Sequence, residues 1–351
     1  MQMAEDNTRL VLLSLERWDE VWRRNQHLAA ALVSLGAVSS IIFVEPPAGS
    51  GFRPYSPEAG IEVVRPPLAA RPLYGGFWFA ARWLRREVLL EDDEVWVNNA
   101  PLGRWLLKHA VCYDVTDDWR ESVQGPASRR RQIRAETLLA RRCTTLVCSA
   151  VLQARWQERY GVRAHLVPNG VDPFAYERAV PLPLSGQGPH ITYVGTLHEE
   201  RVDLALIEAM SNAHKGTVHL VGPNHLSRPS QLRLASLENV EVTGPVPAHQ
   251  VPGWLMASDV LVVPHLVTPF TMSLDAIKAY EYLMTDRPVV ATPTSGFQHL
   301  VQPGLTVATG GDFVEAATTA TGRFDRSTQP TWRQRAQELL HAIRPDTTTS
   351  P

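Results

Sequence analysis

Residues 259–293 constrain the fold of this 351-residue chain more than any other stretch. Val260–Val263 is an apolar run of strand length, and a loop rich in Pro, Thr and Ser follows it. Leu274–Leu283 has the composition of a helix, and a second apolar run, Pro288–Ala291, closes the unit. This order predicts the βαβ unit of a parallel sheet, whose ligands bind outside the carboxyl ends of the strands. We therefore expect an α/β fold with a binding site near the start of this helix.

The expected helix carries a polar pattern. Asp275, Lys278 and Glu281 are three residues apart and share one flank, and Ser273 precedes them as a candidate N-cap. A helix N-terminus next to a lysine and a hydroxyl attracts an anion, and a carboxylate further along the helix can accept two hydrogen bonds from a ribose diol. The pattern predicts a nucleoside diphosphate site, and a solvated helix face is the alternative.

The segments Ile277–Leu283 and Arg287–Thr292 resemble the donor-binding segment of GT-B glycosyltransferases, most closely family 4 and its bacterial relatives. In that family a glutamate at the position of Glu281 binds the ribose hydroxyls. Another family glutamate stands eight positions earlier, where this chain has Ser273. The resemblance implies two Rossmann-like domains with a C-terminal helix that crosses back to the first. It also implies sugar transfer from a nucleoside-diphosphate sugar to an acceptor hydroxyl.

The length suits two domains, and the proline- and glycine-rich segment 181–189 indicates a boundary. We expect an N-terminal acceptor-binding domain over residues 1–180 and a nucleotide-sugar-binding domain over residues 181–328. Residues 329–351 then form the crossover helix and tail.

Three strand ends in the second half complete the expected donor site. The resemblance implies that residues 195–201 hold the diphosphate, where the family often has Arg after the glycine and Lys five residues later. This chain has Thr196 and Arg201 there. It also implies that the base lies against backbone near Gly222 and Val246. The predicted donor residues are Gly195, Thr196, Arg201, Gly222, Val246, Ser273, Asp275, Lys278 and Glu281.

Acidic residues surround the end of the predicted strand Ala110–Val115. Asp117 and Asp118 follow this strand, where a carboxylate is well placed to act as a general base toward an acceptor hydroxyl. The segment 113–119 is similar to the family segment in which many members carry a functional histidine, and Asp117 is its nearest counterpart. Asp117 and Asp118 are therefore the catalytic candidates, and helix capping is the alternative.

The acceptor candidates come from two aromatic, arginine-containing stretches. The resemblance implies that the loop after the first strand lines the cleft between the domains, which makes Trp18, Asp19 and Arg24 cleft candidates. They lie in a predicted helix over residues 16–28 that Asp19 could cap, so capping and surface packing are the alternative. Residues 73–86 interleave aromatics with arginines, which suits a membrane surface, a bulky acceptor that Trp78 would contact, or a core helix with arginines reaching water. Residues 128–142, with six arginines, are expected to form a solvated helix face.

Composition limits the remaining partners. A net charge of −2 gives no overall attraction to nucleic acid. No Asp-x-Asp motif or histidine cluster is visible, so we expect no metal and no cofactor, with Arg201, Lys278 and a helix dipole stabilising the leaving group. Three sparse cysteines suit a reducing cytoplasm, so we expect a cytoplasmic protein that can touch the inner membrane surface.

The sequence leaves the acceptor open among a glycan, a lipid-linked sugar and a small natural product. It also leaves open the base, the donor sugar and whether configuration is retained. Two rival functions share the architecture. A nucleotide-sugar 2-epimerase would alter the sugar nucleotide without consuming an acceptor, and a non-catalytic nucleotide-sugar-binding partner would bind donor without turnover.

Overall fold

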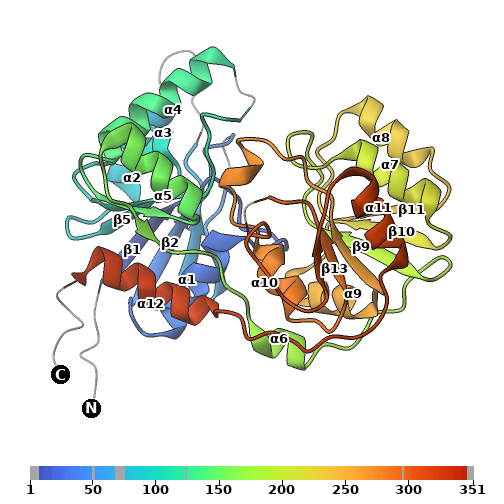
Figure 1. The fold of residues 1–351 in the computed structure, drawn as a ribbon. Helices are drawn as coiled ribbons and strands as arrows, with labels where there is room; N and C mark the ends of the chain where they lie inside the picture. Colours follow the sequence, from blue (N-terminus) through green and yellow to red (C-terminus); the bar gives the residue numbers. More distant parts are fainter. Residues whose placement is uncertain (1–7, 50–51, 68–75, 123–124, 295, 346–351) are drawn as a thin grey trace. The chain divides into compact units, whose positions relative to one another are not determined.

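The computed structural model describes residues 8–49, 52–67, 76–122, 125–294 and 296–345. The chain divides into two compact units (Figure 1). Unit 1 comprises residues 1–168 and 332–351, and unit 2 comprises residues 169–331. Each unit is built on its own sheet with helices on both faces.

The sheet of unit 1 has eight strands in the order β3-β4-β2-β1-β5-β6-β7-β8. All neighbours are parallel except β3, which runs antiparallel to β4. The central strands are apolar runs buried on both faces, as expected of a sheet that helices cover on both sides. The strands are β1 (Arg9–Leu13), β2 (Ser40–Val44), β3 (Tyr55–Glu58), β4 (Ile61–Val64), β5 (Glu94–Val97), β6 (Ala110–Val115), β7 (Thr144–Val147) and β8 (His165–Leu166).

Helices cover the two faces of this sheet unequally. One face buries apolar side chains of α2 (Gly76–Glu87), α3 (Ala100–Gly103), α4 (Pro126–Leu139) and α5 (Ala150–Tyr160). The other face carries α1 (Arg24–Ser34) and the last helix, α12 (Trp332–Ile343), which lie side by side (Figure 1). Residues 73–75 of the predicted aromatic helix and residues 346–351 of the predicted tail lie outside the described residues.

The expected crossover helix is confirmed, because α12 packs on unit 1 after the chain has passed through unit 2. The Trp332 ring stacks on the His27 ring of α1, with the centroids 4.6 Å apart and the planes 5° apart. Burial lowers the pKa of His27 to about 3, so this imidazole is neutral at physiological pH.

The predicted start of the first helix is wrong. α1 begins at Arg24, and the Gln26 side chain accepts a hydrogen bond of 2.9 Å from the Arg23 N–H, as in a capping box. Asp19 instead accepts the Val21 N–H at 3.0 Å and pairs with the Arg23 guanidinium at 3.0 Å. Residues 16–23 therefore form an irregular loop, in which the Asp19 carboxylate binds Val21 and Arg23.

The sheet of unit 2 has six strands in the order β11-β10-β9-β12-β13-β14, all parallel. Counted within the unit, this is the 3-2-1-4-5-6 order of a dinucleotide-binding fold, and the order reverses between β9 and β12. The strands are β9 (His190–Val194), β10 (Thr217–Val221), β11 (Val240–Gly244), β12 (Val260–Val263), β13 (Val289–Ala291) and β14 (Leu305–Val307).

Two apolar clusters join the helices of unit 2 to the two faces of its sheet. One cluster joins the sheet to α7 (Leu204–Ala213), α8 (Arg228–Ala235) and α11 (Gly310–Thr319). The other joins the opposite face to α6 (Pro173–Glu177), α9 (Val251–Ala257) and α10 (Ile277–Leu283).

The boundary between the units lies at 168/169, not at 180/181 as the proline-rich segment suggested. Val171 and Tyr176 are buried in the same apolar cluster as Leu255 and Tyr282 of unit 2. The Leu182 N–H also donates to the Gly253 carbonyl at 3.2 Å. Residues 169–180 therefore belong to the second unit, because Val171 and Tyr176 are buried there.

An ion pair is buried inside unit 1. The Arg24 guanidinium on α1 donates to both Asp114 carboxylate oxygens on β6, at 3.0 and 3.1 Å, and to the Pro168 carbonyl at 3.1 Å. The Asp114 side chain is fully buried, and the Arg24 side chain is 5% exposed. A buried pair of this kind is stable only while both partners are present.

We expect Asp114→Ala to lower the free energy of unfolding of unit 1 by about 3–5 kcal/mol, because it leaves the Arg24 charge buried without its carboxylate. Denaturant unfolding followed by circular dichroism measures this. Glu91→Gln, which removes an exposed carboxylate 4.0 Å from Lys108, is the control and should cost less than about 1 kcal/mol. Equal effects of the two substitutions would contradict the argument.

Candidate active site

The strand-order reversal in unit 2 fixes where a ligand can bind. β9 and β12 lie side by side, and their carboxyl ends are Val194 and Val263. In doubly wound sheets the crevice at such a reversal is the usual ligand site. Gly195 and Thr196 directly follow β9, so two predicted donor residues occupy this position.

Two glycines let the backbone segments at this edge approach closely. A Cβ atom on Gly222 would lie 2.3 Å from the Gly195 carbonyl oxygen. A Cβ on Gly195 would lie 2.8 Å from the Tyr193 hydroxyl and 3.0 Å from Lys278 Nζ. Both positions therefore exclude side chains, and glycine here is typical of backbone that a ligand approaches closely.

Lys278 and Glu281 reach this edge from α10. Lys278 Nζ lies 5.3 Å from the centroid of the Tyr193 ring. Burial, together with the nearby Arg201 charge, lowers the pKa of Lys278 to about 8. Burial raises the pKa of Glu281 to about 7, against the opposing effect of Lys278. Ionisable groups whose pKa values are shifted by burial, such as these two, are characteristic of functional sites.

Two further residues of this site were not selected from the sequence. The buried Tyr193 hydroxyl lies 3.1 Å from His265 Nε2 and donates to the Thr196 carbonyl at 3.3 Å. Burial, with the charges of Lys278 and Arg201, lowers the pKa of His265 well below its usual value, so His265 is neutral. His265 follows β12 as Thr196 follows β9, so the strand-end rule that selected Thr196 could also have found it.

Arg201 adds the second cation of this region. Its guanidinium carbon lies 5.5 Å from the centroid of the Phe270 ring, and its carbonyl accepts the Leu266 N–H at 2.9 Å. Its charge acts on both Lys278 and His265, which places it at the same strand ends. The structure thus brings together Gly195, Thr196, Arg201, Gly222, Lys278 and Glu281.

The prediction that Ser273 caps the helix is wrong. α10 begins at Ile277, with Ala276 at the N-cap, and Ser273 lies in a separate short 3₁₀ helix, Thr271–Ser273. The buried Ser273 hydroxyl donates to the Phe270 carbonyl at 2.6 Å. A serine that bonds its own local backbone favours a turn over a longer helix, so α10 starts three residues later than expected.

Asp275 and Val246 lie apart from this group. The Asp275 carboxylate accepts the Asn169 N–H at 2.5 Å and the Tyr280 hydroxyl at 3.0 Å, so it ties the first residues of unit 2 to α10. Val246 is half-buried in the loop after β11, two residues beyond Gly244, whose carbonyl accepts the Gly222 N–H at 2.8 Å. A role of either side chain in donor binding stays a prediction.

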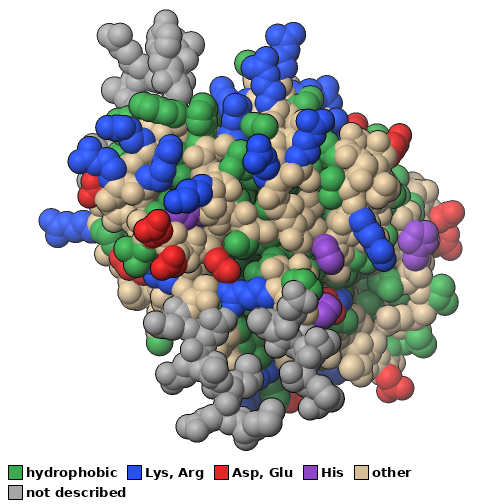
Figure 2. All heavy atoms as spheres, turned by 90° about the vertical axis from the view of Figure 1, so that its left-hand side faces the viewer, with side chains coloured by type: hydrophobic (Ala, Val, Ile, Leu, Met, Phe, Trp, Pro, Cys, Tyr) green, Lys and Arg blue, Asp and Glu red, His purple; other side chains and the backbone are tan. Residues whose placement is uncertain are grey.

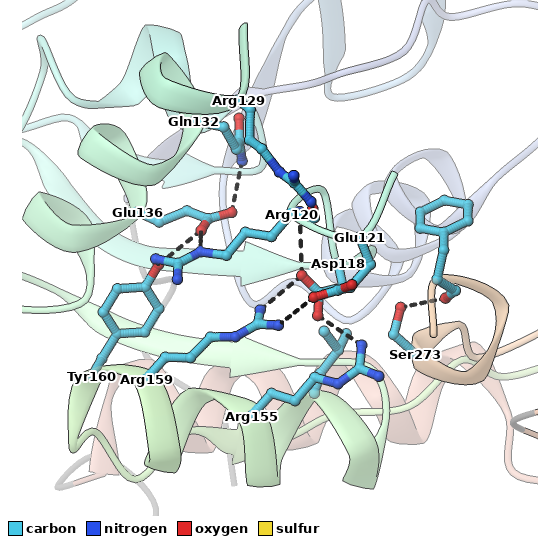
Figure 3. A network of polar contacts seen from close by, with 12 residues as sticks. Asp118, Arg120, Glu121, Arg129, Gln132, Glu136, Arg155, Arg159, Tyr160 and Ser273 are labelled. Carbon is cyan, nitrogen blue, oxygen red and sulfur yellow. Dashed lines mark hydrogen bonds and ion pairs between the residues drawn. The ribbon is translucent and has the colours of Figure 1, made fainter. Parts of the chain in front are cut away.

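In unit 1 the catalytic candidate Asp118 is held by two guanidinium groups (Figure 3). Arg155 and Arg159 donate to its two oxygens at 2.7 and 2.8 Å, and the Arg120 N–H donates to it at 3.3 Å. Burial opposes ionisation, but the hydrogen bonds and charges of Arg159 and Arg155 lower the pKa of Asp118 below its usual value. A carboxylate stabilised in this way is a weak proton acceptor, so the geometry favours a structural role.

The same network continues to α4 (Figure 3). The Arg120 guanidinium lies 3.3 Å from Glu136, which also accepts the Tyr160 hydroxyl at 2.8 Å and the Gln132 amide at 2.9 Å. Burial raises the pKa of Glu136 despite these donors. The loop after β6 is therefore anchored to both α4 and α5.

Asp117 stands in the same anchored loop, next to Asp118. It is half-buried, two residues past the end of β6, and its Oδ2 accepts the Thr116 hydroxyl at 3.0 Å. A role of Asp117 as the proton acceptor stays a prediction.

The acceptor candidates differ in their surroundings. Arg24 is buried in the ion pair with Asp114, so its charge has a structural role within unit 1. The Trp18 ring packs edge-on against Phe43, with centroids 5.1 Å apart. Asp19 is exposed, and Trp78 on α2 is 44% exposed. Acceptor binding by these residues stays a prediction.

Comparison with known proteins finds glycosyltransferases among the relatives of this chain. Residues 188–323 match the family described as glycosyl transferases group 1. The chain is 25% identical over 219 residues to the putative teichuronic acid biosynthesis glycosyltransferase TuaH of Bacillus subtilis (strain 168). That match covers 58% of this chain and 55% of TuaH, so it spans little more than half of the relative's length.

Two solved structures share the whole architecture. WaaG, a glycosyltransferase involved in lipopolysaccharide biosynthesis, superimposes with a TM-score of 0.67 at 16% identity over 97% of this chain and 96% of that one. HepE of Anabaena, solved in complex with UDP, gives 0.57 at 14% identity over 95% and 94% of the two chains. The fold is GT-B, and the resemblance to GT-B glycosyltransferases of group 1 is confirmed.

We expect Asp118→Asn to lower the free energy of unfolding of unit 1 by about 2–3 kcal/mol, because it weakens two charge-assisted hydrogen bonds in a buried network. Thermal and denaturant unfolding measure this. The neighbouring Asp117→Asn, which leaves the arginine pair intact, should change stability by less than about 0.5 kcal/mol. If Asp117→Asn destabilises the protein as much as Asp118→Asn, the division of roles between the two residues is wrong.

Proposed function

We propose that this chain transfers a sugar from a nucleoside-diphosphate sugar to an acceptor hydroxyl. The observation that carries the proposal is the group of Gly195, Lys278 and Glu281 at the strand-order reversal of unit 2. It lies inside the segment that matches the group 1 glycosyltransferases.

In this proposal the diphosphate lies against the Gly195–Thr196 backbone, with Lys278 and Arg201 as its cations. Negative charge grows on the departing nucleoside diphosphate during transfer, and preorganised cations lower the barrier by stabilising it. Glu281 accepts hydrogen bonds from the ribose, and the base lies against backbone near Gly222. The UDP of the HepE structure supports a uridine nucleotide as the first one to test.

Neither a metal nor a cofactor is part of the proposal. Among the described residues, no group of three or more His, Cys, Asp and Glu side chains is placed to hold a metal ion. On the acceptor side, Asp117 takes the hydroxyl proton and Asp118 keeps its loop in place.

The acceptor that we propose is a glycan or a lipid-linked sugar, and a small natural product is the remaining candidate. The association of TuaH with teichuronic acid biosynthesis supports a glycan acceptor. No helix in the described part of the chain is long and apolar enough to cross a membrane. Peripheral contact with a membrane and a cytoplasmic location stay predictions.

The two rival functions predict reaction mixtures that differ from that of a glycosyltransferase. The 2-epimerase would convert the nucleotide sugar without an acceptor, and the non-catalytic binding partner would bind it unchanged. Analysis of the reaction mixture with and without acceptor glycans separates all three functions.

We expect UDP, GDP or TDP to raise the melting temperature, because a ligand at 100 times its Kd stabilises the folded state by about 2.7 kcal/mol. Lys278→Ala and Glu281→Ala should each weaken nucleotide binding at least about tenfold, the effect of losing one charge-assisted hydrogen bond. Titration calorimetry measures the affinities. Lys215→Ala, which removes an exposed lysine of the same unit, is the matched control. Unchanged affinities in both site variants, with every nucleotide, would refute the proposed donor site.

Donor affinity should also depend on pH in a predictable direction. The pKa of Lys278 is lowered to about 8, so this amine loses its charge above pH 8. The pKa of Glu281 is raised to about 7, so this carboxylate becomes protonated below pH 7. Affinity for a nucleotide sugar should therefore be greatest between these values and fall on both sides. Lys278→Arg should remove the alkaline limb and Glu281→Gln the acid limb, measured by titration calorimetry across pH. A flat profile in the unmodified protein would contradict the assignment.

A further inference from the structure

We infer that the outward surface of α2 and α4 in unit 1 binds an anionic lipid bilayer. This inference extends the proposed function, in which a membrane-held acceptor is one candidate, but its test uses no sugar transfer. From the sequence the two helices had separate interpretations, since residues 73–86 suggested a membrane or acceptor contact and residues 128–142 a solvated face. The structure joins them.

A direct contact makes the two helices one surface. The Arg131 guanidinium carbon of α4 lies 5.7 Å from the centroid of the Phe77 ring of α2. α3 also contacts both helices. Seven exposed arginines and two exposed aromatic residues share this surface, which we name the α2–α4 surface: Trp78, Phe79, Arg82, Arg85, Arg86, Arg129, Arg130, Arg131 and Arg134. Figure 2 shows Lys and Arg side chains gathered on the upper part of this face, with hydrophobic side chains among them.

The positive charge of the α2–α4 surface is not balanced by acids of the same helices. The one acidic residue of α4, Glu136, points inward, where it is buried and binds Arg120 and Gln132. On α2 only Glu87, at the last position, is acidic, and it lies 3.9 Å from Arg86. The whole chain has a net charge of −2, so its overall charge would not attract it to an anionic membrane. The local concentration of arginines on the α2–α4 surface provides such an attraction.

The aromatic side chains favour a bilayer over a soluble polyanion. Trp78 and Phe79 are 44% and 41% exposed, whereas Ala80, Ala81 and Leu84 on the opposite side of α2 are buried. The helix thus has its own inner apolar side and shows two further large rings to the outside, next to arginines. Aromatic residues beside basic ones on an exposed helix face are characteristic of helices that lie in the membrane interface. A contact with a soluble acidic polymer would use the arginines and leave both rings in water.

Co-sedimentation of the full chain with vesicles tests the inference. We expect binding to vesicles of phosphatidylcholine with phosphatidylglycerol, little binding to pure phosphatidylcholine, and loss of binding at high salt. The triple variant Arg82→Gln, Arg130→Gln, Arg134→Gln should weaken partitioning at least about tenfold, since each basic residue near an anionic surface adds to the attraction. Trp78→Ser alone should also weaken it.

A matched control removes three exposed arginines of unit 2, Arg178→Gln, Arg228→Gln and Arg326→Gln, and should bind vesicles like the unmodified chain. Three results would overturn the inference. One is no binding to anionic vesicles at low salt, and another is an equal loss in the control. The third is binding of soluble polyglutamate as tight as that of vesicles, with no effect of Trp78→Ser, which would make the surface a polyanion site. Nucleotide-induced melting shifts, measured on the same variants, report on the donor site separately.

Discussion

The reversal of strand order between β9 and β12 is the constraint on which the candidate donor site depends. It brings the ends of two strands, distant in sequence, to one edge, and the Gly195 and Gly222 backbones meet there. Because Gly195 has no side chain, Lys278 can lie against the Gly195–Thr196 turn. The Tyr193 hydroxyl donates to the Thr196 carbonyl of that turn, and the neutral His265 ring lies within hydrogen-bond distance of the same hydroxyl. The Lys278 charge thus lies next to two side chains, Tyr193 and His265, that carry no charge.

Unit 1 uses arginine differently in its interior and on its surface. Arg24, Arg155 and Arg159 are bound to buried carboxylates, and these pairs tie α1 to β6 and α5 to the loop that follows β6. The planar guanidinium suits such pairing, because it can meet both oxygens of one carboxylate. The arginines of α2 and α4 are instead exposed. Arginine therefore stabilises the interior of unit 1 through ion pairs, and it gives the α2–α4 surface its positive charge.

Much of the fold could be predicted from the sequence, because its buried strands are apolar runs and the segment around Glu281 resembles a known family. The strand ends at Gly195 and Gly222 followed from the same reasoning. Local patterns failed where a distant partner decides the role of a side chain. Arg24 finds Asp114 ninety positions later, and Asp118 finds Arg155 and Arg159, which no spacing rule indicates. Ser273 failed for a local reason, since its hydroxyl bonds the carbonyl three residues before it.

The docking of α12 on α1 has a consequence for how the chain matures. Protein synthesis runs from the amino terminus, and early domains generally fold while later ones are still being made. Here the last helix of unit 1 is synthesised after all of unit 2, so the ring stack of His27 with Trp332 cannot form until the residues of unit 2 have been made. During synthesis, α1 therefore lacks its contact with α12 until unit 2 has been made.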